Sequence, residues 1–306
     1  MERTERHGQM PGARFVDPKV LARIGSLELL CRTVVDGFIN GLHRSPYFGA
    51  SVDFAEHRGY AAGDDISRID WRLYARTDRY YVKQYEADSN ANFSVLLDVS
   101  RSMSFASRGI TKLDYGRYLA GCLTYFAHRQ RDRVGIITFD DDIVDHVPPS
   151  AKHLELVLHT LDRTTARRPG HLGAPLRKMA EHFGRRGIVV LISDLYETPE
   201  AVMDALKPLR SRGNDLIVFH VLDPAELDLT FDEPSSFQDL ESGEQLPVVP
   251  AVFGEQYRAL LCEHVTALSS RLSENRIYYA LFNTAGPLYY ALFKYLSARQ
   301  RLSRVR

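Results

Sequence analysis

The sequence predicts an α/β protein with a doubly wound, mostly parallel sheet, preceded by a helix and a small strand-rich unit. From residue 93 onward, short apolar stretches rich in β-branched residues alternate with longer amphipathic stretches. Strands of this kind are typical of a parallel sheet whose two faces are both covered by helices. Asp98 and Asp194 each follow such a stretch, at the carboxyl ends of strands where open parallel sheets bind ligands.

Composition excludes several classes of protein. The chain has 306 residues with 39 Lys+Arg and 39 Asp+Glu, so its net charge favours neither nucleic acid nor an anionic membrane surface. The N-terminal stretch lacks a hydrophobic signal core, and no uninterrupted apolar run reaches the roughly 20 residues of a membrane span. The three cysteines lie in apolar stretches, as small hydrophobes in a reducing cytosol do. We therefore expect a cytoplasmic protein with no nucleic-acid partner and no membrane span.

The first part of the chain predicts a helix and a small strand-rich unit. Apolar residues recur at alternating four- and three-residue steps over 18–42, which indicates an amphipathic helix. Its apolar stripe is expected to pack on the protein's own body, and a docking face for a partner is the less favoured alternative. Residues 51–90 hold two alternating, strand-like stretches around a charged segment. We place the domain boundary at 92, with 1–92 as the N-terminal segment and 93–306 as the α/β domain.

The α/β domain is predicted from alternating strand and helix patterns. The expected strands lie at 93–98, 133–139, 143–147, 187–193, 215–222 and 276–283, and the expected helices at 112–130, 151–162, 172–183, 199–211, 251–274 and from about 288 to 301. A turn-rich insertion at 223–250 interrupts this alternation. It is expected to form a hairpin around Ser242-Gly243.

A cluster of oxygen-bearing side chains follows the first predicted strand. Asp98, Ser100 and Ser102 stand at alternate positions, and Ser193 and Asp194 follow a neighbouring strand. Mg²⁺ prefers oxygen ligands in octahedral geometry and keeps some of its waters, so these loops together indicate a magnesium site. The alternative is that the two aspartates only cap the following helices and satisfy loop amides.

The Asp-x-Ser-x-Ser run resembles the metal-ion-dependent adhesion site (MIDAS) of the von Willebrand factor A fold, a Rossmann-type fold. The resemblance implies that Asp98, Ser100, Ser102, a threonine on a second loop and Asp194 surround one Mg²⁺. It also implies that the open position of the ion takes an acidic group from a partner protein. One position departs from this pattern, because Gly170 stands where the threonine is expected. Occupancy of the site by Mg²⁺ therefore stays open.

A longer stretch of sequence extends the resemblance to one particular family. "GYAAGDDISRIDWRLYARTDRYYVKQYEAD", closely followed by "LLDVSRSM", is similar to the signature of the domain-of-unknown-function family 58 (DUF58, also written DUF 58). This resemblance implies a von Willebrand factor A-like domain that acts as an adaptor or co-chaperone of a MoxR-type AAA+ ATPase. Other proteins that present an acidic group are further candidate partners.

The charged segment before the sheet has two interpretations. Its acidic and basic side chains either form ion pairs that hold the unit on the main domain, with Trp71 as a buried anchor, or form a partner-docking surface. Arg and Trp are over-represented among the residues that dominate binding energy. The residues of this candidate surface are Asp64, Asp65, Arg68, Asp70, Trp71 and Arg76.

The sequence favours a protein-interaction module over an enzyme. It contains no phosphate-binding loop, dinucleotide-binding glycine motif or His-Glu-x-x-His motif. One alternative is a metal-dependent hydrolase or phosphotransferase with Asp98 as nucleophile, although Ser100 stands where such enzymes carry a second aspartate. The other alternative is a scaffold whose metal site has lapsed, which Gly170 favours.

Overall fold

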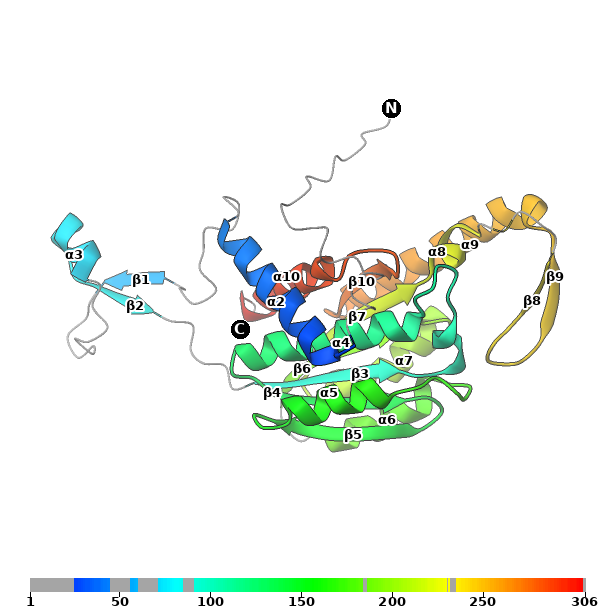
Figure 1. The fold of residues 1–306 in the computed structure, drawn as a ribbon, viewed down its shortest axis with the longest axis horizontal. Helices are drawn as coiled ribbons and strands as arrows, with labels where there is room; N and C mark the ends of the chain where they lie inside the picture. The colour runs from blue at the N-terminus through cyan, green and yellow to red at the C-terminus, as the bar shows by residue number, and fades with distance from the viewer. Residues whose placement is uncertain are drawn as a thin grey trace, which may run out of the picture.

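The computed structural model describes residues 25–44, 56–59, 71–84, 91–183, 186–229, 231 and 235–304. Within these residues, six strands form the central sheet in the order β10-β7-β6-β3-β4-β5 (Figure 1). β5 pairs antiparallel with β4, and the other pairings in this sheet are parallel. The strands are β3 (Asn92–Asp98), β4 (Arg133–Phe139), β5 (Ile143–Ser150), β6 (Gly187–Ser193), β7 (Asp215–Leu222) and β10 (Tyr278–Asn283). The predicted mostly parallel α/β sheet is confirmed.

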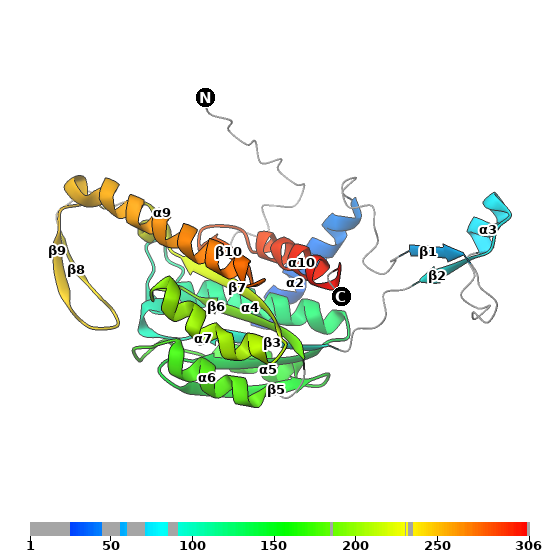
Figure 2. The ribbon, with the colours of Figure 1, turned by 180° about the vertical axis from the view of Figure 1, so that it is seen from behind.

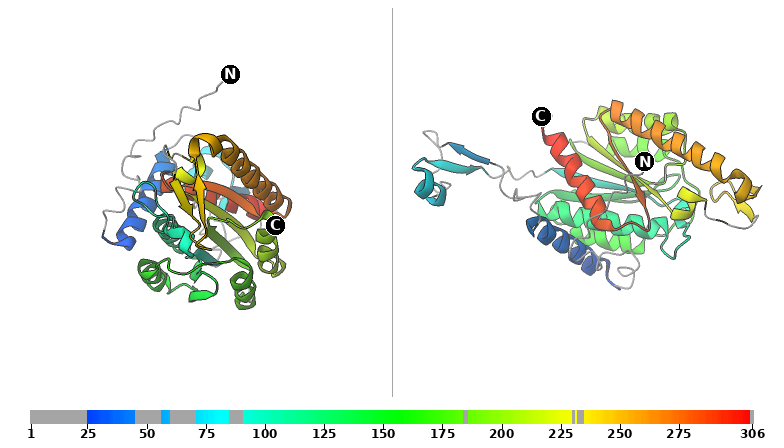
Figure 3. Two further views of the ribbon diagram at one scale, coloured as in Figure 1. Left: turned by 90° about the vertical axis from the view of Figure 1, so that its right-hand side faces the viewer. Right: turned by 90° about the horizontal axis from the view of Figure 1, so that it is seen from above.

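Helices cover both faces of the sheet because successive strand side chains point to opposite sides. On β3, Val95 and Leu97 belong to one hydrophobic core and Leu96 to the other. The layers are visible end-on in Figure 3. The first core takes residues from α2 (Leu27–Arg44), α4 (Lys112–Arg129), α5 (Leu154–Arg163) and α10 (Leu288–Arg304). The second core, on the face seen in Figure 2, takes residues from α6 (Gly173–His182), α7 (Pro199–Ser211) and α9 (Pro250–Glu274).

Helix α2 is part of the α/β body. Leu30 and Cys31 are buried in the same core as α4, and Phe38 meets Phe126 edge-on with ring centroids 6.2 Å apart. Helices α2 and α4 approach closely at Gly121 of α4, where a Cβ atom would lie 2.6 Å from the Cys31 sulfur of α2. The predicted packing of this amphipathic helix on the protein's own body is confirmed for the residues described.

The insertion forms the predicted hairpin. β8 (Ser235–Gln238) pairs antiparallel with β9 (Gln245–Val248), and the turn contains Gly243 with a positive φ of 78°. A short helix α8 (Pro224–Asp228) precedes it, and the 3₁₀ helix η4 (Arg101–Ser104) follows β3. The N-terminal unit consists of β1 (Glu56–Gly59), α3 (Trp71–Thr77) and β2 (Tyr81–Gln84), with β1 and β2 antiparallel. None of the helices within the described ranges has both the length and the apolarity needed to cross a membrane.

Candidate functional site

The loops after β3 and β6 meet at the carboxyl edge of the sheet, because these strands are parallel neighbours. Asp98 ends β3, and one of its carboxyl oxygens, Oδ1, accepts a hydrogen bond from the Ser100 amide at 2.9 Å. Its other oxygen, Oδ2, lies 2.6 Å from the Ser193 hydroxyl at the end of β6. Ser193 Oγ also accepts from the Leu195 amide at 3.1 Å. Asp98 therefore ties the two strand ends together.

Asp98 lies in a buried polar cluster. Its exposed fraction is 6%, and Ser100 and Ser102 are buried beside it with their hydroxyl oxygens 3.1 Å apart. Burial, and then the charge of Asp194, raises the pKa of Asp98 to about 7, although hydrogen bonds from Ser100 and Ser193 act in the opposite direction. The carboxyl group of Asp98 is thus partly protonated near neutral pH.

A buried lysine holds the second aspartate of the site. The Lys112 ammonium, at the start of α4, lies 2.8 Å from Asp194 Oδ2 and 2.7 Å from Glu226 Oε1, and 3.0 Å from the Tyr196 hydroxyl. The Lys112 side chain is fully buried. Burial opposes its charge, but the carboxylates of Asp194 and Glu226 outweigh burial and raise the pKa of Lys112. Asp194 and Glu226 therefore share the one positive charge of Lys112.

Gly170, which stands where the resemblance implies a threonine, lies beside this cluster. A Cβ atom on Gly170 would lie 2.5 Å from the Ser100 Cβ and 3.3 Å from the Asp140 backbone. A glycine is needed here because the two loops approach closely, and not because the backbone has a positive φ. Position 170 consequently brings no side-chain oxygen to the cluster and has no room for a threonine in this conformation.

A carboxylate from the hairpin reaches the same place. Glu241, in the turn between β8 and β9, accepts a hydrogen bond from the Ser102 amide at 2.7 Å through Oε1. Its Oε2 accepts from the Gly170 amide, also at 2.7 Å. The Arg101 amide donates to the Arg168 carbonyl at 2.7 Å and holds the two loops together. One carboxylate is thus held by main-chain amides from two loops.

The residues do not fit the complete Mg²⁺ site that the resemblance implies. Asp98, Ser100 and Ser102 lie together, as predicted, but Asp194 is paired with Lys112, and Gly170 supplies no oxygen ligand. Among the described residues, no group of three or more His, Cys, Asp and Glu side chains is arranged to hold a metal ion. What remains is a reduced set of three neighbouring oxygen-bearing side chains.

The candidate docking surface of the N-terminal unit is only partly described. Asp64, Asp65, Arg68 and Asp70 lie outside the described residues, as does the side chain of Arg76. Trp71 is 56% exposed and contacts Tyr74 edge-on at 6.2 Å between ring centroids. The interpretation of Trp71 as a buried anchor is therefore wrong, because its ring packs on a neighbouring turn of its own short helix.

Three residues of the site were not found from the sequence. Lys112 lies on the buried face of α4 together with Tyr115 and Leu119, so a lysine on an apolar helix face is the signal that could have revealed it. Glu226 belongs to a capping box with Asp223, a pattern that is readable in sequence. Glu241 has no such local signal, because its role depends on how the hairpin returns to the sheet edge.

The fold and the site together define an open, mostly parallel α/β sheet protein whose polar site lies at the strand ends. Within this class, the chain belongs to the family described as "Protein of unknown function DUF58", whose profile matches residues 56–264. The family resemblance expected from the sequence is thereby confirmed.

Several individual proteins are similar to this chain. Uncharacterized proteins of Mycobacterium tuberculosis and Mycobacterium bovis are 29% identical to it over 252 residues, which covers 79% of this chain and 78% of theirs. A solved aerotolerance-related membrane protein from Bacteroides fragilis is 15% identical, with a TM-score of 0.48, and covers 69% of this chain and 99% of its own. A von Willebrand factor type A structure from Catenulispora acidiphila is 13% identical, with a TM-score of 0.31 and coverages of 62% and 44%.

Proposed function

We propose that this protein is a non-catalytic, von Willebrand factor A-like interaction module that binds an acidic group of its partner at the carboxyl edge of the sheet. The observation that carries the proposal is the convergence of the Ser102 and Gly170 amides on one carboxylate. Charge-assisted hydrogen bonds of this kind are stronger than those between neutral groups. They give the edge a specific affinity for carboxylates.

The partner that we propose is a MoxR-type AAA+ ATPase, for which the protein would act as adaptor or co-chaperone in the cytoplasm. This choice rests on the family resemblance of the sequence. Large apolar side chains near the hairpin offer further contact area to such a partner. Those exposed between the hairpin and the first half of α9 are Leu246, Val249, Val252, Phe253 and Leu260.

The site is better suited to recognition than to catalysis. A nucleophilic carboxylate must be ionised and reachable, whereas Asp98 is buried, hydrogen-bonded through both oxygens and has a pKa raised to about 7. Ser100, two residues on, is hydrogen-bonded to Ser102 and provides no second carboxyl group to act as general acid. We therefore favour a degenerate adhesion site over a hydrolase or phosphotransferase.

The experiment is a co-purification from the native host, with and without ATP, that compares two matched variants. Ser102→Asp places a carboxylate beside the binding amides and should repel an acidic group of the partner. Ser104→Asp adds the same charge at an exposed position of the same 3₁₀ helix and is the control. We expect an AAA+ ATPase with the wild type and with Ser104→Asp but not with Ser102→Asp, provided that both variants melt cooperatively. No ATPase in any nucleotide state would contradict the proposal.

A further inference from the structure

We propose that the β8–β9 hairpin is an internal ligand of this site, and that its Glu241 occupies the position that an acidic residue of the partner takes. The inference rests on the proposed function and adds its regulation: the hairpin must leave before the partner binds. The site would thus recognise carboxylates from two sources, one within the chain and one outside it.

The first argument is the geometry of the contact. Both oxygens of the Glu241 carboxylate are used, one by the Ser102 amide and one by the Gly170 amide, each at 2.7 Å. These amides belong to loops about 70 residues apart in sequence, and Glu241 is distant from both. Such a two-pronged contact positions the hairpin tip on the sheet edge.

The second argument is that hydrogen bonds within the turn fix the backbone of Glu241. Asp239 accepts hydrogen bonds from the Glu241 amide at 2.8 Å and from the Ser242 hydroxyl at 2.7 Å. These hydrogen bonds lower the pKa of Asp239, so its carboxylate is ionised at neutral pH and accepts both of them. The tip therefore presents Glu241 in a preformed conformation, which reduces the entropy lost when its carboxylate docks.

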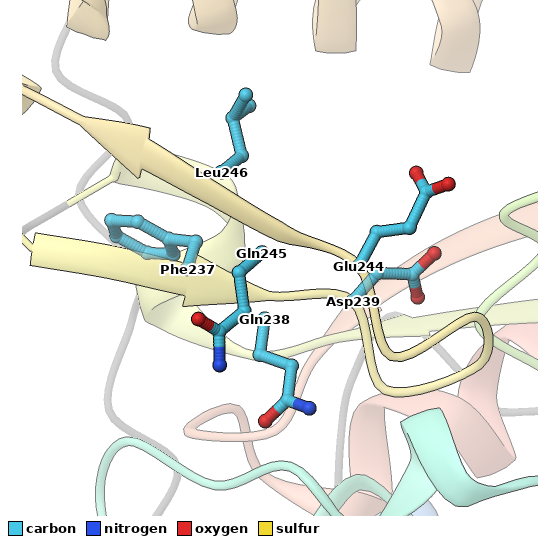
Figure 4. A pocket seen from close by; sticks show the side chains of 6 residues that line it. All are labelled: Phe237, Gln238, Asp239, Glu244, Gln245 and Leu246. Atoms are coloured by element: carbon cyan, nitrogen blue, oxygen red, sulfur yellow. The ribbon is translucent and has the colours of Figure 1, made fainter.

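The third argument is that the rest of the hairpin is suited to move. β8 and β9 form a separate two-stranded sheet, and an isolated pair of strands has little stability of its own in water. One pocket is lined entirely by residues of the hairpin (Figure 4), namely Phe237, Gln238, Asp239, Glu244, Gln245 and Leu246. Leu246 is 65% exposed. The tip contact can thus open without unpacking either core of the sheet.

The consequence for binding follows from the population of the open state. When only a fraction of the protein is competent to bind, the apparent affinity falls by that fraction. If the hairpin is closed in about nine molecules of ten, its release should strengthen partner binding about tenfold. The partner then competes directly with Glu241.

The first measurement is amide hydrogen exchange on the full chain without any partner. We compare the wild type, Glu241→Ala and Glu244→Ala, where Glu244 is an exposed residue of the same turn and serves as the matched control. The Ser102 and Gly170 amides should exchange faster in Glu241→Ala only. Equal exchange in all three proteins would overturn the internal ligand, whether or not an ATPase binds.

The second measurement is the affinity of the co-purified AAA+ ATPase for the same three proteins. Glu241→Ala should bind about tenfold more tightly, and Glu244→Ala should match the wild type. Affinity that is unchanged or weaker in Glu241→Ala would overturn the competition between hairpin and partner. Absence of the ATPase from every preparation would instead refute the proposed function, and the exchange data would still decide whether Glu241 occupies the site.

Discussion

Substitution of Lys112 by methionine tests the central ion network of the site. Methionine keeps a long, flexible side chain but removes the ammonium group that contacts Asp194 at 2.8 Å and Glu226 at 2.7 Å. Both carboxylates are at most 14% exposed, so each would be left with an uncompensated buried charge. Removal of one partner from a buried pair costs about 3–5 kcal/mol.

This loss of stability should be large in a melting experiment. For a domain of this size, a change of 1 kcal/mol moves the melting temperature by roughly 2–4 °C, so Lys112→Met should melt roughly 6–20 °C below the wild type. Because the pKa of Lys112 is raised above its ordinary value of 10.5, the ion pairs contribute fully below that pH and are lost only above it. Circular dichroism or differential scanning fluorimetry at pH 7.5 therefore measures the whole effect.

A matched control lies on the surface. Lys178 contacts Asp142 at 2.7 Å, but both side chains are 56% exposed, and solvent screens such pairs. Lys178→Met should leave the melting temperature nearly unchanged. If Lys112→Met has the same melting temperature as Lys178→Met, the buried network does not stabilise the fold and our assignment of its role is wrong. Adding Asp194→Asn and Glu226→Gln to Lys112→Met should recover part of the lost stability, because the stranded charges disappear.

Three further predictions concern the same loops. Asp98→Asn should be more stable than the wild type above pH 7 in urea unfolding with a chelator. Folding raises the pKa of Asp98 from 3.8 to about 7, so wild-type stability falls as the pH rises between these two values and stays low above them. A lower stability of the variant at pH 8 would show that the charged carboxylate is favourable. Gly170→Ala should cost about 1–3 kcal/mol through overpacking against Ser100, whereas Gly37→Ala, with nothing within 4 Å of its Cβ, should not destabilise. Titration calorimetry with Mg²⁺ should give no saturable heat, and a stoichiometric binding curve would contradict our assessment of the ligand set.

The sheet and the strand-end residues of the site can both be predicted from the sequence, because both are encoded locally. Strands such as β3 and β6 are apolar throughout and end at a polar residue, so both the strand and its carboxyl end are encoded locally. The position of Gly170 beside Ser100 follows from the same strand order. Glu241 and Lys112 contribute through tertiary contacts more than 70 residues from their partners, and no local periodicity encodes such a separation. The exposure of Trp71 could not be predicted, because an aromatic residue in a charged segment is equally consistent with a buried anchor and an exposed side chain.

The charges of Asp98 and Asp194 determine how strongly the edge of the sheet opposes a docking carboxylate. An incoming negative charge meets Asp98, which is partly protonated near neutral pH because its pKa is about 7, and Asp194, which shares the charge of Lys112 with Glu226. The groups that contact the docked carboxylate are the Ser102 and Gly170 amides, which carry positive partial charge toward it. Lys112 thus compensates part of the negative charge at this edge, and the close approach of Gly170 to Ser100 brings the two amides to one point. The lysine and the glycine are therefore parts of one carboxylate-binding arrangement.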